Sequence, residues 1–325
     1  MGLLKVSASP HIRHEDTTRV LMSDVIIALF PLLIWGTYIF GLRVLTVTAI
    51  SVISCVLSEY IFNLIIKKPS PVGDLSAIVS GLLLAYNLPA TSPLWLPAVG
   101  GAFAMVVVKG LYGGIGKNFM NPVLAARIFL FASWPSHMTA YSEALHRLPL
   151  FGEVDSVSSA TTLSILKSGQ MTDKSILDLF IGNMSGCIGE ISALLILACG
   201  LYLLARRVIT WHIPVSFIGT VAVLAFLCAP PSLDKILFML SELFSGGLML
   251  GAVFMATDYV TSPVTPKGRI IYGIGCGFLT VFIRIFGGYP EGVSFAIVIM
   301  NLFVWYLDRG TKPTKFGGGK KHAKA

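Results

Sequence analysis

Gly246-Gly247-Leu248-Met249-Leu250 opens a short apolar segment that ends at Thr257-Asp258, with Thr261-Ser262-Pro263 soon after it. In the first half of the chain, Ser80-Gly81-Leu82-Leu83-Leu84 opens another short segment, which ends at Asn87-Leu88-Pro89. An interrupted helix leaves backbone groups unpaired in a bilayer, which is tolerated only where protein or a wet cavity surrounds them. The sequence therefore predicts two broken helices at matching places inside a membrane protein.

A second pair of matching stretches follows in the same order. Leu111-Tyr112-Gly113-Gly114 and Ile285-Phe286-Gly287-Gly288 each close a helix and lead into the last span of a half. Because each half has five crossings, the second half enters the membrane from the side opposite to the first. The predicted architecture is two inverted five-helix repeats, and in transporter-like proteins such repeats place broken helices near the midplane.

Composition indicates an all-α polytopic membrane protein. The 325 residues are 55% hydrophobic and 12% charged, with a mean hydropathy of +0.80, whereas roughly 25% of an ordinary soluble domain is charged. Apolar runs near the length of about 20 residues that crosses a bilayer recur from end to end. We expect ten spans, the third, fifth and eighth of them short or interrupted, near 20–40, 44–66, 74–88, 95–112, 120–134, 186–205, 212–229, 242–257, 269–286 and 292–307. The chain then divides into an N-terminal segment 1–19, a first membrane repeat 20–135, a loop 136–185, a second membrane repeat 186–307 and a basic tail 308–325.

The orientation follows from lysine and arginine in the short flanks of the spans, since these residues are enriched on the cytoplasmic side. One face carries Lys5, Arg13, Arg19, Lys67, Lys68, Lys117, Arg206, Arg207, Lys267, Arg269 and the basic tail. On the other face acidic residues outnumber basic ones. We therefore expect both termini to be cytoplasmic and the loop 136–185 to be extracytoplasmic.

The formal net charge of +8 does not require a nucleic-acid partner. The cations lie in juxtamembrane positions, where the positive-inside bias and anionic lipid headgroups explain them. The Lys312–Ala325 tail fits lipid contact or docking to a cytoplasmic partner. The first apolar run is long enough to remain in the bilayer, so we expect no cleavable signal peptide. Cysteines occur singly in predicted helices and predict neither a metal site nor a disulfide; they are Cys55, Cys187, Cys199, Cys228 and Cys276.

Ionisable residues within or at the edge of the membrane are costly in lipid and should face the interior or an interface. They are Asp24, Glu59, Asp74, Arg127, Glu190, Glu242, Asp258 and Arg284. Each of them could belong to an ion path or bind a cofactor. The alternative is that it caps a broken helix or forms an ion pair. Asp258 is the candidate for ion coupling, because it follows a broken segment whose freed carbonyls could join its carboxylate in a hard oxygen site for Na⁺. The alternative is that Asp258 caps the turn formed by Thr261-Ser262-Pro263.

The long loop contains Ser158-Ser159-Ala160-Thr161-Thr162-Leu163, a hydroxyl-rich stretch of small residues. Such residues favour turns because their side chains bond to nearby backbone groups. Taken alone, the stretch predicts a solvated turn. A phosphoester needs a free hydroxyl, which a threonine in this loop offers.

Several motifs, in this order along nearly the whole chain, resemble the NqrB/RnfD family. They are Ser9-Pro10-His11-Ile12-Arg13, Gly116-Lys117-Asn118-Phe119-Met120-Asn121-Pro122, the stretch Ser158 to Leu163, the stretch Ala256 to Gly268, and the stretch Phe286 to Ala296. The family contains membrane subunits of Na⁺-pumping NADH:quinone reductase and of Rnf complexes. The early first span resembles the Rnf branch. In the family, the stretch that matches Ser158 to Leu163 is a site of flavin attachment and usually has glycine at the position of Ser159. Serine is also small.

The resemblance implies that Thr161 carries FMN as a phosphoester, with Thr162 as the competing hydroxyl. It also implies a noncovalent riboflavin in the helical core. As a member of the Rnf branch, the chain would pass electrons between ferredoxin and NAD⁺, coupled to translocation of Na⁺ or H⁺. Its partners would be the other Rnf subunits, A, B, C, E and G.

Two other functions fit the same pattern. One is a transporter or channel with inverted repeats and no redox chemistry, which would have a central pore and no covalent flavin. The other is a membrane scaffold for redox partners whose loop is unmodified. Flavin fluorescence that stays with the denatured chain would separate the first hypothesis from both alternatives.

Overall fold

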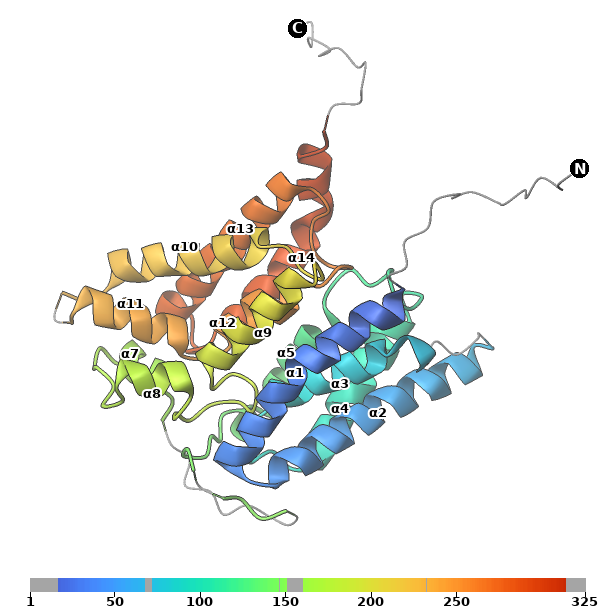
Figure 1. Cartoon of the computed structure of the whole chain (residues 1–325), viewed down its shortest axis with the longest axis horizontal. Helices are drawn as coiled ribbons and strands as arrows, with labels where there is room; N and C mark the ends of the chain where they lie inside the picture. Colours follow the sequence, from blue (N-terminus) through green and yellow to red (C-terminus); the bar gives the residue numbers. More distant parts are fainter. Residues whose placement is uncertain (1–16, 68–71, 146, 151–159, 232, 314–325) are drawn as a thin grey trace, which may run out of the picture.

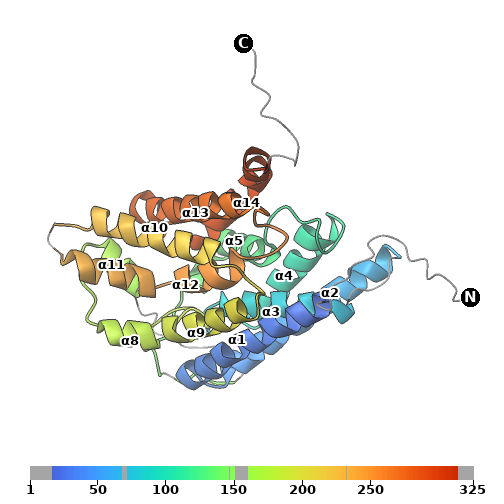
Figure 2. The same ribbon diagram turned by 45° about the horizontal axis from the view of Figure 1, so that its top comes forward.

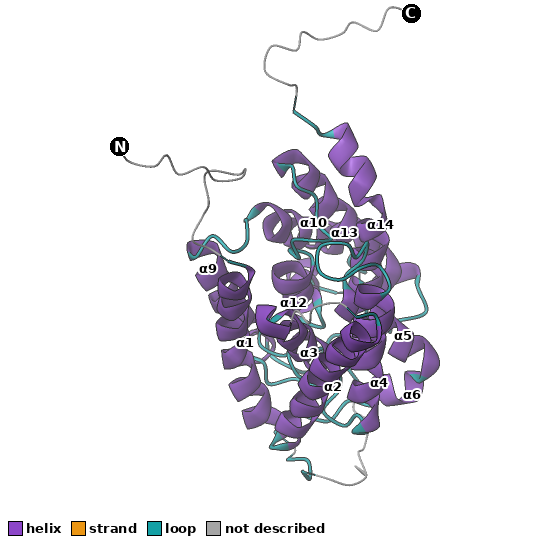
Figure 3. Ribbon diagram, turned by 90° about the vertical axis from the view of Figure 1, so that its right-hand side faces the viewer, coloured by secondary structure: helices purple, strands orange, loops and turns teal. Residues whose placement is uncertain are grey.

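The computed structural model describes residues 17–67, 72–145, 147–150, 160–231 and 233–313. Most of the N-terminal segment, the Ser9–Arg13 motif, Ser158, Ser159 and residues 314–325 of the basic tail lie outside these ranges. The described part is built from helices, without a named strand (Figure 3). It holds one isolated bridge, between Pro89 and Cys187. The described part of the chain is thus all-helical.

A first group of helices comes from residues 18–133 (Figure 1, blue to green). It consists of α1 (Thr18–Phe40), α2 (Arg43–Ile65), a 3₁₀ turn (Val72–Asp74), α3 (Ser76–Tyr86), α4 (Trp95–Ala102) with its π-helical continuation (Phe103–Gly110), and α5 (Pro122–Ser133). Helix α2 packs against both α3 and α4. Gly81 allows the close approach of α3, because a Cβ there would lie 2.6 Å from the Cα of Val52.

A second group comes from residues 193–310 (Figure 1, yellow to red). It consists of α9 (Ala193–Ala205), α10 (His212–Cys228), α11 (Lys235–Phe244), α12 (Leu248–Leu250) with its π-helical continuation (Gly251–Met255), α13 (Pro266–Phe286) and α14 (Val293–Gly310). Along the chain, the two groups are separated by three short helices: α6 (Pro135–Met138), α7 (Thr162–Lys167) and α8 (Ile176–Ile181). Helix α13 packs between α10 and α14 (Figure 2). The two groups meet where α1 packs on α9 and α5 packs on α14.

Several helices start at residues that the sequence marks clearly. Asn121 caps α5 by accepting from the amides of Val123 and Leu124, and Pro122 occupies the first helical position. Thr265 caps α13 in the same way before Pro266. Proline suits this position because the first amide of a helix has no intrahelical partner.

Helix lengths support part of the expected span pattern. Among the described residues, four helices are long and apolar enough to cross a membrane: Thr18–Phe40, Arg43–Ile65, Pro266–Phe286 and Val293–Gly310. A fifth span results if Lys235–Phe244 and Leu248–Met255, which are bent by 61°, are counted together. The other expected spans correspond to apolar helices of 10–17 residues.

Two predicted boundaries were wrong. The eighth span begins at Lys235 and not near 242, because Asp234 caps α11 by accepting from the amides of Ile236 and Leu237. The helix of the sixth span begins at Ala193 and not near 186, because Ser192 provides its cap. In the sixth span the apolar run begins before the helix does, and in the eighth the run begins after the helix has started. Hydropathy alone therefore located these two helix starts poorly.

The predicted helix breaks are present at both places. Helix α3 ends at Tyr86, and α4 begins only at Trp95. Between them, Arg43 donates to the carbonyls of Ala90 and Ser92, each at 3.1 Å. In the second group the π-helix ends at Met255, and α13 begins only at Pro266. A further break, at Gly246, was not predicted; its φ of +67° favours glycine. A Cβ at Gly246 would also lie 2.5 Å from Leu163.

Candidate functional site

Thr161 caps the short helix α7. Its backbone is extended, and its Oγ1 accepts a hydrogen bond from the Ser164 amide at 3.3 Å. Ser164 Oγ in turn donates to the Thr161 carbonyl at 2.7 Å. A capping side chain acts through an oxygen lone pair and not through its hydroxyl hydrogen. Esterification of the Thr161 hydroxyl is therefore compatible with the cap.

The two candidate threonines are the first buried residues after the exposed Ala160. Ala160 is exposed, whereas Thr161 is 9% and Thr162 is 6% exposed. Thr162 is the first residue of α7, so its hydroxyl does not have the capping position. Burial does not indicate which of the two threonines is the attachment point. Their positions differ, because Thr161 is the N-cap of α7 and Thr162 is not.

Thr161 borders a small cavity of about 10 Å³. The walls are the turn 161–163, the turn 184–186, the helix break at 245–246, and the side chains of Glu190 and Glu291. Two deeply buried oxygens of lining residues, Glu190 Oε2 and Ser245 Oγ, have no hydrogen-bond partner. The sequence motif thus lies beside a polar cavity that is formed by segments distant in the chain.

Arg127, on α5, binds side chains from both groups of helices beside this cavity. Its Nη1 donates to Asn87 Oδ1 at 2.8 Å and to Glu190 Oε1 at 2.9 Å. The same nitrogen lies 3.2 Å from Ser294 Oγ, and Nη2 pairs with Glu291 Oε2. The Arg127 side chain is 8% exposed and that of Glu190 is 1% exposed. Such burial is tolerated because each charge has a partner.

A second buried pair fixes the helix break. Arg284 on α13 donates to Glu242 Oε2 at 2.6 Å and to the Glu242 carbonyl at 2.7 Å. Its other terminal nitrogen donates to the Ser245 carbonyl at 3.3 Å. The carbonyls at the end of α11 have no helical partners at the bend, and the Arg284 guanidinium donates to them instead.

The expectation that ionisable residues face the interior is largely confirmed. Asp24, Glu59, Arg127, Glu190, Glu242 and Arg284 are all less than 9% exposed. Asp74 and Asp258 are half-buried. The buried pairs also include Glu59 with Lys109 at 2.6 Å, and Asp24 pairs with the more exposed Arg206 at 3.1 Å.

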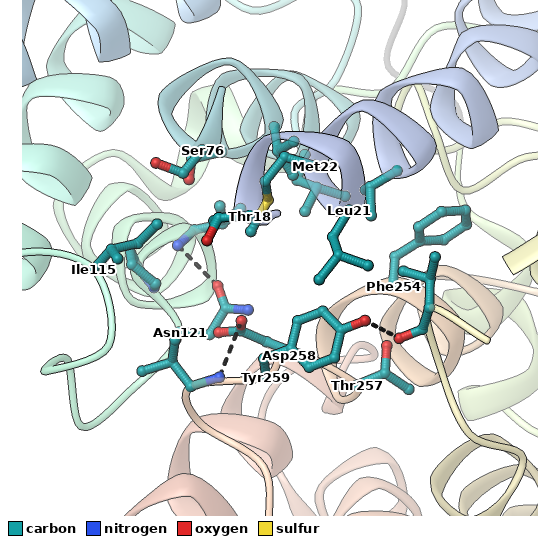
Figure 4. Close-up of a pocket in the computed structure, with 18 of the residues that line it drawn as sticks. Thr18, Leu21, Met22, Ser76, Ile115, Asn121, Phe254, Thr257, Asp258 and Tyr259 are labelled. Atoms are coloured by element: carbon teal, nitrogen blue, oxygen red, sulfur yellow. Dashed lines mark hydrogen bonds between the residues drawn. The ribbon is translucent and has the colours of Figure 1, made fainter. Parts of the chain in front are cut away.

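A much larger cavity, of about 330 Å³, shares no lining residue with the Thr161 cavity. It lies between the start of α1, the end of α9, and the segments 115–123 and 253–260. Leu21, Met22 and Phe254 contribute apolar walls, and Asn121 and Asp258 contribute polar ones (Figure 4). A cavity that is mostly apolar with a few polar groups is typical of a small-molecule site.

Asp258 lies at the wall of this larger cavity, away from Thr161. Its Oδ2 accepts from Thr261 Oγ1 at 3.0 Å, and its Oδ1 accepts from the Val260 amide at 3.5 Å. The predicted capping of the following turn is therefore present. The same carboxylate borders a cavity, so the capping interaction and an ion-binding role are geometrically compatible.

A polar chain within the first group also reaches this cavity. Lys109, in the π-helical segment after α4, binds Glu59 Oε1 at 2.6 Å and Ser76 Oγ at 2.7 Å. Ser76 Oγ donates onward to Asp74 Oδ1 at 2.6 Å. Both Ser76 and Lys109 line the cavity. π-Helical segments occur frequently at functional sites, and Lys109 lies in one.

Sequence reasoning missed three residues that complete these sites: Lys109, Glu291 and Ser245. Lys109 follows three valines and reads as part of an apolar span. Glu291 was noted only as part of a motif, and Ser245 only precedes a glycine pair. A signal was available for Lys109, since a lone lysine inside an apolar run needs a buried acid, and Glu59 offers one.

Comparison with known proteins places these features in one family. The chain matches the model of the NQR2, RnfD, RnfE family over residues 5–317. It is 49% identical to the D subunit of the Na⁺-translocating ferredoxin:NAD⁺ oxidoreductase complex of Acetobacterium woodii, with 99% of this chain and 98% of that protein covered. It is 38% identical to the D subunit of the proton-translocating ferredoxin:NAD⁺ oxidoreductase complex of Clostridium ljungdahlii, with 97% of each covered.

A third relative is the D subunit of the ion-translocating oxidoreductase complex of Aliivibrio salmonicida, which is 36% identical over 97% of this chain and 99% of its own length. The similarity therefore includes both groups of helices and the segment between them. The resemblance seen in the motifs is confirmed, and the chain belongs to the NQR2, RnfD, RnfE family.

Proposed function

We propose that the chain is the D subunit of an Rnf-type complex, which passes electrons between ferredoxin and NAD⁺ and couples this transfer to translocation of Na⁺ or H⁺. The observation that carries the proposal is the 49% identity to such a subunit over nearly the full length of both proteins. Its partners in that role are the other subunits of the complex, A, B, C, E and G. The relatives differ in the ion they are named for, so the similarity leaves Na⁺ and H⁺ both open.

The second part of the proposal is that Thr161 carries FMN through a phosphoester. Support comes from the Thr161 hydroxyl, which caps α7 as an acceptor, and from the unpartnered Ser245 Oγ in the adjoining cavity. A bound flavin supplies chemistry in which electrons are taken up and released singly or in pairs. The chain contributes the anchor, the polar wall of the cavity and the buried charges behind it.

The third part assigns the noncovalent riboflavin to the larger cavity. Its volume of about 330 Å³ lies within the usual range for ligand sites, roughly 300–1,000 Å³. Its apolar walls suit a flat aromatic ring system, and Asn118, Asn121 and Thr257 offer hydrogen-bonding groups.

A single experiment tests whether the purified protein holds both flavins and whether one is attached to the chain. The purified complex is denatured, the soluble fraction is chromatographed, and the digested chain is analysed by mass spectrometry. We expect riboflavin in the soluble fraction and FMN, less one water, on the peptide that contains Thr161. A peptide of unmodified mass from a host with the flavin transferase would contradict the covalent assignment.

We also propose the finer architecture that the sequence indicates: ten crossings in two inverted repeats of five, with both termini cytoplasmic. The two broken segments support it, since the ends of α3 and of the π-helix after α12 approach each other, with Asn87 Nδ2 at 3.7 Å from Met255 Sδ. The segment that bears Thr161 would then be extracytoplasmic.

Cysteine labelling tests this orientation. We expect a cysteine at Ser168, which is exposed after α7, to react with an impermeant thiol reagent added outside intact cells. A cysteine at the exposed Lys312 should react only after the cells are opened. A cysteine-free chain is the background for both variants. The reverse pattern would place the Thr161 side of the protein in the cytoplasm.

Asp258 is our candidate for ion coupling. Asparagine keeps an oxygen to accept from Thr261 Oγ1, so Asp258→Asn should preserve the turn and the assembly of the complex. The loss of a hard anionic ligand should raise the ion concentration needed for half-maximal turnover by at least about tenfold. Ferredoxin-dependent NAD⁺ reduction and ion uptake by inverted vesicles measure this effect. Unchanged rates with unchanged ion dependence would reduce Asp258 to a capping residue.

A further inference from the structure

The small cavity beside Thr161 has the size and the walls of a site for a single ion. Its volume of about 10 Å³ is near the minimum that holds one water-sized particle. Oxygen-bearing side chains of Glu190, Ser245 and Glu291 reach it from three separate segments of the chain.

Two of these side chains lack partners although they are deeply buried. Glu190 is 2% and Ser245 is 1% exposed, and neither Glu190 Oε2 nor Ser245 Oγ has a hydrogen-bond partner. Leaving a buried polar atom unpaired is costly, and a carboxylate oxygen is costlier than a hydroxyl. The native cavity should therefore hold something that binds oxygen.

The local charge indicates that this occupant is a cation. Glu190 and Glu291 bring two negative charges, and Arg127 compensates one of them. Arg127 engages Oε1 of Glu190 and Oε2 of Glu291, so the second oxygen of each carboxylate is not used by these ion pairs. A phosphodiester on Thr161 would add a further negative charge beside the same cavity. Two uncompensated charges then remain, which a divalent cation would neutralise.

The ligand types favour a hard cation. Cys187 Sγ lies within 4.8 Å of oxygens of Glu190 and Glu291, but the sulfur already accepts from Arg127 Nη2 at 3.6 Å. The remaining ligands are carboxylate and hydroxyl oxygens, which Ca²⁺ and Mg²⁺ prefer and softer metals do not.

We propose that this cavity binds one divalent cation, Ca²⁺ or Mg²⁺, held by Glu190, Ser245, Glu291 and an oxygen of the phosphodiester on Thr161. The inference rests on the proposed attachment of FMN to Thr161. The cation would fix the phosphodiester against two carboxylates that would otherwise repel it.

The test measures the metal content of the purified, flavinylated complex after exchange into metal-free buffer, by elemental mass spectrometry. Ser245→Ala and Glu190→Gln should each lower the bound Ca²⁺ or Mg²⁺ by one equivalent per chain. Glutamine keeps an oxygen for Arg127, so the second variant retains that hydrogen bond. Ser241→Ala is the matched control, because Ser241 Oγ is also buried and unpartnered on α11 but does not line the cavity.

A second measurement follows the thermal midpoint of the subunit, detected by its covalent flavin fluorescence. Added Ca²⁺ or Mg²⁺ should raise the midpoint of the wild type and of Ser241→Ala after chelation, and should raise it less in Ser245→Ala and Glu190→Gln. Equal metal content and equal midpoints in all four proteins would overturn the proposal. Gel fluorescence keeps the two hypotheses apart, because a chain without covalent flavin refutes the attachment, whereas a flavinylated chain without the cation refutes only this inference.

Discussion

Thr161→Asn should abolish the flavin fluorescence that stays with the chain on a denaturing gel. Asparagine caps helices about as well as threonine does, so α7 should keep its start, but its amide offers no hydroxyl for a phosphoester. Ferredoxin-dependent NAD⁺ reduction by the assembled complex should fall to the background rate, because the carrier at this position would be missing. Gel fluorescence and the rate in membrane vesicles measure the two effects.

The matched control is Thr162→Val, which removes the neighbouring hydroxyl with little change of shape. This variant should keep both fluorescence and electron transfer, since Thr162 does not occupy the capping position. Fluorescence that survives in Thr161→Asn and disappears in Thr162→Val would move the attachment by one residue. Loss in both variants, with normal amounts of chain, would point to recognition of the whole turn by the modifying enzyme.

The broken helices could be predicted because their causes are local. Proline at 89 and prolines at 263 and 266 interrupt helices by their own backbone properties, and the structure has a break at each place. The caps at Asn121 and Thr265 are equally local. These features require only a few neighbouring residues, so the sequence displays them directly.

The partners of the buried charges could be predicted only in part. Membrane energetics requires that Glu59 or Arg127 find a partner, but the identity of that partner depends on how distant helices pack. Arg127 meets Glu291 across 164 positions of sequence, and a single chain without an alignment gives no signal for that contact. Arg43 shows the same limit, because its position between two expected spans does not indicate that it donates to carbonyls in the break between α3 and α4.

The small cavity beside Thr161 was beyond prediction for a further reason. Four of its walls come from segments that are polar for separate local reasons: a helix cap, a turn, a helix break and the loop before α14. Each has an adequate local explanation, so none suggests a common site. Only the packing of α7 against α11 brings the Thr161 turn beside Ser245 and Gly246.

Arg127→Met should be the most destabilising single change in the described part of the chain. Methionine fills a similar volume, but it leaves the carboxylates of Glu190 and Glu291 without their cation and Asn87 Oδ1 without its donor. Removing one partner from a buried ion pair costs about 3–5 kcal/mol of stability, and here two carboxylates lose the same partner. We expect the chain to accumulate poorly and its thermal midpoint in detergent to fall sharply.

Companion variants show whether charge or shape is responsible. Arg127→Lys keeps the charge but cannot reproduce the fork that reaches Glu190 through one nitrogen and Glu291 through the other, so it should recover only part of the midpoint. Combining Arg127→Met with Glu190→Gln and Glu291→Gln removes the stranded charges and should recover more, because neutral side chains cost less to bury than unpaired ions. If the triple variant is no more stable than Arg127→Met, the geometry of the guanidinium, and not charge balance, joins the two groups of helices.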